Sequence, residues 1–167
     1  MNTQAIAIKP ATIGSVSHGT LRNVDLLDTL SKELESRVLL NGAFYALPEN
    51  MAERDRLNTL QFDALELASH LEDGTKEDGE EASELVNALV ETLGMLFAPG
   101  YCYFGTHPGD GSDYGYWPDM DSINELPKYN DLSEVPEDQD EDFQIVNDHG
   151  NITVYSGTTR QEIIGIV

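Results

Sequence analysis

The spacing of apolar residues over the first hundred positions constrains the fold more than any other feature of the chain. Residues 52–71 carry apolar side chains at intervals of three and four, the pattern of a helix with one buried side. These are Leu57, Leu60, Ala64, Leu67 and Leu71. The same spacing predicts a helix over residues 20–40 and another that ends before Pro99. We expect Thr20 to cap the first helix, and Asp78 with Glu81 to cap the third.

The sequence changes in character after Gly100. Residues 101–104 and 114–117 are rich in aromatic side chains and predict a hairpin with a long Gly/Pro/Asp connection. Residues 143–147 and 152–155 flank a strong turn signal and predict a second hairpin. A further strand is expected at residues 162–167.

A length of 167 residues suits one domain, residues 1–167. We expect residues 1–100 to be mainly helical and residues 101–167 to be β-rich, with an acidic coil at 119–142. Residues 5–8 predict a short edge strand, and the small polar residues 12–19 predict a loop. The predicted fold class is therefore α+β, with three amphipathic helices packed on a small antiparallel sheet.

The charge is distributed very unevenly along the chain. Residues 1–62 hold seven acids and six bases, and are nearly neutral. Residues 63–148 hold 23 acids but only Lys76 and Lys128 as bases, a net charge of −21. A surface that serves only solubility usually mixes both signs, because unrelieved like charge destabilises the compact state. Duplex DNA carries one negative charge per ~1.7 Å of its axis, so a duplex about 36 Å long carries the same charge as this segment.

The composition of the chain argues against several classes of protein. No stretch approaches the roughly 20 apolar residues of a membrane-spanning helix, and residues 1–9 lack the features of a secretory signal. Cys102 is the only cysteine, which excludes an internal disulfide and a cysteine-based zinc cluster. We expect a soluble intracellular protein that nucleic acid and anionic membranes repel.

The main functional hypothesis is that carboxylates imitate the phosphates of DNA and bind the basic groove of a nucleic-acid-binding protein. The predicted helical contacts are Asp63, Glu66, Glu77, Glu80, Glu84 and Glu91. The predicted loop contacts are Asp110, Asp113, Asp119 and Asp121, with Tyr116 and Trp117 as aromatic anchors. No residue set predicts catalysis, and we expect neither an enzyme nor a cofactor.

Other interpretations compete with this hypothesis. The aromatic side chains of residues 114–117 also suit simple packing of a hairpin on the helices. The acidic run at residues 134–142 is either a solvated linker or the edge of a contact surface. His107, Asp110 and Asp113 are candidate ligands for a divalent metal. Finally, the chain is also consistent with a structural or accessory module whose charge only maintains solubility.

Three segments of the chain carry a resemblance to known proteins. Residues 15–22 (SVSHGTLR), 103–117 (YFGTHPGDGSDYGYW) and 146–151 (VNDHGN) resemble small acidic proteins encoded by phages and other bacterial mobile elements. In charge, the chain is also similar to phage inhibitors that mimic DNA and block restriction or CRISPR systems. The group supplies no activity to carry over to this chain. The DNA-mimic hypothesis places the protein in the cytoplasm of a bacterial host, with a host defence complex, a nuclease or a DNA-bound regulator as its target. The sequence leaves a homodimer open.

Overall fold

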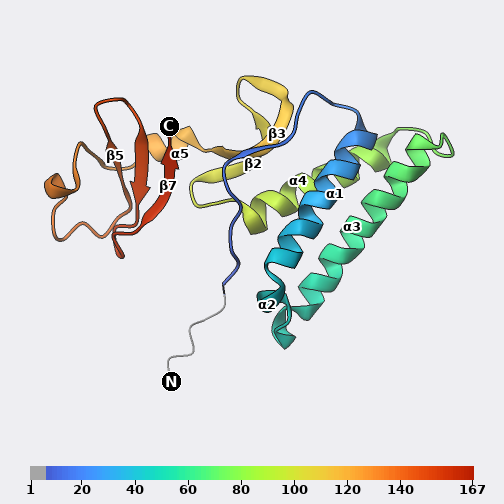
Figure 1. Cartoon of the computed structure of the whole chain (residues 1–167), viewed down its shortest axis with the longest axis horizontal. Coiled ribbons are helices and arrows are strands. Elements are labelled where there is room, and N and C mark those ends of the chain that lie inside the picture. Colours follow the sequence, from blue (N-terminus) through green and yellow to red (C-terminus); the bar gives the residue numbers. More distant parts are fainter. Residues whose placement is uncertain (1–6) are drawn as a thin grey trace. The chain divides into compact units, whose positions relative to one another are not determined.

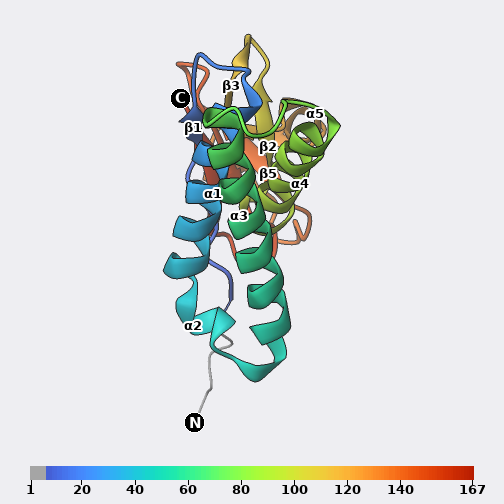
Figure 2. The same cartoon turned by 90° about the vertical axis from the view of Figure 1, so that its right-hand side faces the viewer.

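The computed structural model describes residues 7–167, and three long helices account for most of its first hundred residues. They are α1 (Asn23–Leu40), α3 (Met51–Glu72) and α4 (Glu80–Phe97). The short α2 (Gly42–Tyr45) and the 3₁₀ turn η1 (Pro48–Asn50) connect α1 to α3. Helix α1 packs against both α3 and α4 (Figures 1 and 2). The apolar spacing therefore predicted all three long helices correctly.

The core between these helices is built from the predicted apolar positions. Its fully buried leucines come from α1, α3 and α4, and include Leu27, Leu30, Leu34, Leu57, Leu89 and Leu93. Each such side chain contributes about 1.5–3 kcal/mol when it leaves water. Burial on this side leaves the opposite sides of α3 and α4 to the charged residues.

Both predicted helix caps are wrong, because the capping side chains bind other groups. Helix α1 begins three residues after Thr20, whose hydroxyl donates to the Asp25 carboxylate at 2.7 Å. Helix α4 follows Gly79, and no side chain caps its first turn. The Asp78 carboxylate instead accepts a hydrogen bond from the Asn23 amide at 2.7 Å.

A three-stranded sheet accompanies the helices. Its strands are β1 (Gly14–Ser17), β3 (Asp110–Pro118) and β2 (Cys102–His107), in that order across the sheet. The predicted loop at 12–19 is thus partly a strand, which pairs antiparallel with β3. The predicted long connection is also wrong, because β2 and β3 extend through it and leave only a tight turn. Gly115 is required at this pairing, since a Cβ there would overlap the Gly14 carbonyl.

The second sheet is formed by the C-terminal residues. It contains β4 (Lys128–Tyr129), β5 (Phe143–Val146), β6 (Ile152–Tyr155) and β7 (Glu162–Ile166), in sequence order. The β4–β5 pair is parallel and the other two pairs are antiparallel. The predicted β5–β6 hairpin and the strand after it are confirmed.

The predicted acidic coil at 119–142 is wrong in part. It contains α5 (Met120–Asn124), the strand β4 and the 3₁₀ turn η2 (Leu132–Glu134). Helix α5 forms because the Asp119 carboxylate caps it, and because Ile123 enters the core of the second sheet, fully buried.

The structure divides into two compact units where the sequence suggested one domain. The first contains the residues up to Ala98 together with Phe104–Trp117, and the second contains Pro99–Tyr103 and Pro118–Val167. The β2–β3 hairpin thus belongs largely to the helical unit. Of the expected strand at 5–8, residues 5 and 6 lie outside the described residues, and Ala7 and Ile8 are not in a strand. The described fold is α+β, as predicted, and no helix in residues 7–167 is long and apolar enough to cross a membrane.

Candidate partner-binding surface

The six predicted helical acids are all exposed, and three of them meet at one groove of the first unit. Asp63 and Glu66 from α3 and Glu84 from α4 line this groove, whose volume is about 630 Å³. Glu81, which we had not selected as a contact, lies there too. We call this the acidic groove. Its carboxylates lie together although they come from two helices.

Helical geometry explains why further acids flank the groove. Glu80, Glu84 and Glu91 are separated by four and seven residues, so they share one side of α4. That side is opposite the buried Leu89 and Leu93. Glu80 and Glu91 are 11 positions apart, or about 17 Å along the helix axis. Glu77 precedes them in the exposed connector between α3 and α4.

The charge of this region is almost unopposed. Residues 63–91 contain ten acids and one base, Lys76, a net charge of −9. Lys76 pairs with Glu81, with its Nζ 3.2 Å from Oε2. A duplex about 17 Å long carries roughly ten charges, at one per ~1.7 Å. Four of the ten acids lie along that length of α4, and the other six come from α3 and the connector.

Acids in the N-terminal third behave differently, since many have a basic partner. Ion pairs join Arg37 to Glu33 at 2.7 Å, Lys32 to Asp28 at 2.7 Å and Arg56 to Glu53 at 2.8 Å. The hydrogen bonds from Arg56 lower the pKa of Glu53, which keeps it charged. The contrast between paired and unpaired acids thus follows the charge boundary in the sequence.

Two of the predicted loop acids belong to the first unit and are engaged by local contacts. Asp110 accepts hydrogen bonds from the Ser112 hydroxyl at 2.7 Å and from its amide at 2.9 Å. These bonds, with smaller contributions from His18 and His107, lower the pKa of Asp110. Asp113 accepts from the Ser15 hydroxyl at 2.5 Å and lies 3.5 Å from His18. Both residues are only partly exposed and their carboxylates already accept hydrogen bonds, so they are less available to a partner than the helical acids.

The other two loop acids, Asp119 and Asp121, belong to the second unit. Asp119 caps α5, accepting from the Ser122 hydroxyl at 2.6 Å, and these hydrogen bonds lower its pKa. Asp121 lies in the first turn of α5 and is exposed.

The prediction that Tyr116 is an exposed anchor is wrong. Its side chain is 1 % exposed, because its position in β3 directs the ring into the helical core against Phe104. Trp117 is half-buried; its indole N–H donates to the Gly105 carbonyl at 3.0 Å and its ring contacts His107. These contacts support the alternative that the aromatic run packs the hairpin.

Two apolar side chains that sequence analysis missed lie on the acidic helices. Phe62 on α3 is 63 % exposed and Met95 on α4 is 83 % exposed. Phe62 is four residues before Glu66, and Met95 is four residues after Glu91, so each shares a helix side with an acid. The sequence did contain a signal for their exposure, because neither residue lies on the apolar side of its helix.

The alternative metal site gains no support from the geometry. His107 Nδ1 accepts a hydrogen bond from the Gly109 amide at 3.0 Å, while Asp110 and Asp113 bind Ser112 and Ser15. The described part of the chain holds no group of three or more His, Cys, Asp or Glu residues arranged to bind a metal ion.

Comparison with known proteins does not assign a family. No protein-family model matches the chain, no curated protein matches it significantly, and no solved structure matches it significantly.

Proposed function

We propose that this protein is an inhibitor that mimics the charge of DNA and occupies the nucleic-acid-binding groove of a bacterial defence protein. The partner would be a restriction enzyme, a CRISPR effector or a similar DNA-binding complex. The inhibitor acts by binding, and the carboxylates of the acidic groove and its flanks pair with the Lys and Arg side chains that otherwise hold phosphates.

The observation that carries the proposal is the unopposed charge on α3, α4 and their connector. Ten acids face one base over residues 63–91, and the six predicted contacts there are exposed. Such a surface attracts a cationic cleft from a distance and accelerates association. The proposed contact therefore centres on the first unit.

Phe62 and Met95 replace Tyr116 as the anchors in this proposal. Charge alone gives attraction without a fixed register, whereas a few well-packed apolar contacts often dominate binding energy. Both side chains are more than half exposed and accompany the acids on their helices. They would contact apolar patches beside the phosphate-binding residues of the partner.

The test measures displacement of a labelled DNA duplex from a panel of restriction enzymes and CRISPR effectors at low salt. The variant Glu77→Lys/Glu80→Lys/Glu84→Lys reverses three exposed acids of the surface. A matched control, Glu35→Lys/Glu49→Lys/Asp55→Lys, makes the same change of charge at exposed positions of the same unit. The proposal predicts that the wild type and the control displace DNA and that the first variant does not.

Two outcomes would contradict the proposal. If the wild-type protein displaces DNA from no member of the panel, the charge does not serve mimicry of these partners. If both triple variants lose displacement equally, net charge alone is responsible and the acidic groove is not the contact site.

A further inference from the structure

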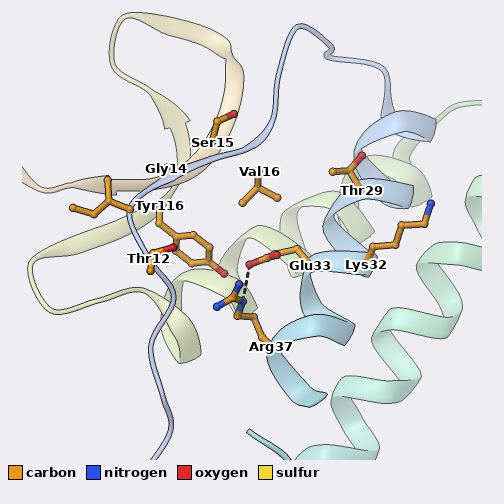
Figure 3. A pocket seen from close by; sticks show the side chains of 10 residues that line it. Thr12, Gly14, Ser15, Val16, Thr29, Lys32, Glu33, Arg37 and Tyr116 are labelled. Carbon is orange, nitrogen blue, oxygen red and sulfur yellow. Dashed lines mark ion pairs between the residues drawn. The ribbon is translucent and has the colours of Figure 1, made fainter. Parts of the chain in front are cut away.

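A second pocket of the first unit lies apart from the acidic groove, between β1 and α1. Its volume is about 400 Å³, within the range of small-molecule sites. Lys32, Glu33 and Arg37 come from α1, Thr12 from the segment before β1, and Tyr116 from β3 (Figure 3). Each base of the lining has an acidic partner: Arg37 pairs with Glu33 within the lining, and Lys32 pairs with Asp28, whose carboxylate lies 2.7 Å from its Nζ.

The arginine in this pocket has hydrogen-bonding capacity to spare. Its Nε lies 2.7 Å from Glu33 Oε1, and the two side chains are only 19 % and 15 % exposed. Despite this distance, Nε makes no well-aligned hydrogen bond within the described residues. A guanidinium offers five N–H donors in a planar fork that matches a carboxylate. Arg37 is thus held in place by Glu33 with further donors available.

The hydroxyl of Tyr116 has the Glu33 carboxylate as its neighbour but makes no well-aligned hydrogen bond to it. It is buried and makes no hydrogen bond within residues 7–167, and Figure 3 shows it directed toward Glu33 and Arg37. A buried hydroxyl that lacks a hydrogen bond is unfavourable and requires an explanation. Burial raises the pKa of Tyr116, and Glu33 raises it further through its charge and as a neighbouring acceptor, while Arg37 lowers it by less, so the hydroxyl remains a donor at neutral pH.

We propose that this pocket binds a small organic acid that carries a hydrogen-bond donor beside its carboxylate, the chemistry shared by α-hydroxy and α-amino acids. The ligand carboxylate accepts from Arg37 and from the Tyr116 hydroxyl. The neighbouring hydroxyl or ammonium of the ligand donates to Glu33, which swings from its contact with Arg37 and uncovers Tyr116. This site is independent of the proposed DNA mimicry, because none of its residues belongs to the acidic groove.

The test uses three four-carbon diacids that differ in one substituent. L-malate carries the α-hydroxyl, L-aspartate carries the α-ammonium, and succinate carries neither. Each is titrated into the full chain labelled with ¹⁵N, while NMR follows the amides of Gly14, Val16 and Arg37. We expect malate or aspartate to shift these amides with a Kd of about 1 mM or below, and succinate to bind at least about tenfold more weakly.

Two matched variants separate ligand binding from folding. Tyr116→Phe removes the unpartnered hydroxyl and should weaken binding about tenfold while the fold is retained, since the hydroxyl makes no hydrogen bond within the described chain. Tyr45→Phe removes the other unpartnered buried tyrosine hydroxyl, which is outside the pocket, and should leave binding unchanged.

The results decide between the parts of the proposal. Binding of malate alone identifies a hydroxy acid, and binding of aspartate alone identifies an amino acid. Equal binding of succinate would overturn the requirement for a donor on the ligand. An absence of shifts for all three acids up to about 10 mM, or unchanged binding by Tyr116→Phe, would overturn the site.

Discussion

Glu84→Gln should stabilise the protein, because the acidic groove concentrates like charges. Glu84 lies four residues after Glu80 and three after Glu81 on α4, and it shares the groove with Asp63 and Glu66. Like-charge pairs at these helical spacings each destabilise by about 0.2–0.5 kcal/mol. Removing two pairs therefore raises the free energy of unfolding by about 0.4–1 kcal/mol. Glu and Gln have nearly equal helix propensities, so the substitution isolates the charge.

The assay is thermal unfolding followed by far-ultraviolet circular dichroism, at low salt and at about 1 M NaCl. At the lower salt we expect Tm to rise by about 1–4 °C. At about 1 M salt the Debye length is about 3 Å, so the difference should disappear. Glu35→Gln on α1 is the control, since Glu35 has no acid three or four residues away and should gain nothing. Destabilisation by Glu84→Gln, or stabilisation that salt does not change, would refute the reasoning.

Three further predictions concern the second unit. Burial raises the pKa of Cys102 to about 11, so at pH 8 alkylation of the native thiol should be about a hundredfold slower than that of an ordinary cysteine; equal rates would show an accessible thiolate. The buried amide of Gln144 donates hydrogen bonds to the carbonyls of Ile123 at 2.8 Å and Leu126 at 3.2 Å. Gln144→Leu removes both bonds and should lower the opening free energy measured by hydrogen exchange in β6 by about 2–4 kcal/mol. A decrease below about 0.5 kcal/mol would contradict this role. The hydrogen bonds to Asp119 lower its pKa below 3.8. The charged carboxylate therefore stabilises the folded state at neutral pH, and this contribution is lost as the pH falls through the lowered pKa. An NMR titration midpoint at or above 3.8 would be inconsistent with the cap.

The long helices were predictable because their apolar periodicity repeats over many residues. Each seam supplies several independent positions, such as Leu57, Ala64 and Leu67 on α3, and burial of all three agrees with the pattern. The exposure of Glu66 and Glu84 follows from the same periodicity. The meeting of these two acids at one groove depends on how α3 packs beside α4, which no local pattern encodes.

The missed features depend on partners that are distant in the sequence. Strand β1 is four residues long and exists because it pairs with β3, about a hundred residues later. Asp78 does not cap α4 because Asn23, 55 positions away, donates to it. The burial of Tyr116 is set by the register that places it opposite Gly14. Helix α5 was different, since the Asp119–Ser122 cap was a local signal that the acidic composition obscured.

The central claim is that the carboxylates on α3, α4 and their connector occupy the same site on a partner as DNA. The most direct measurement is the apparent Kd of this protein for a purified defence enzyme, determined at increasing concentrations of a duplex that the enzyme binds. Direct competition predicts that the apparent Kd rises linearly with the duplex concentration, from its value without duplex, and reaches no plateau. An apparent Kd that does not change with duplex would mean that this protein and DNA bind separate sites, and would contradict the account.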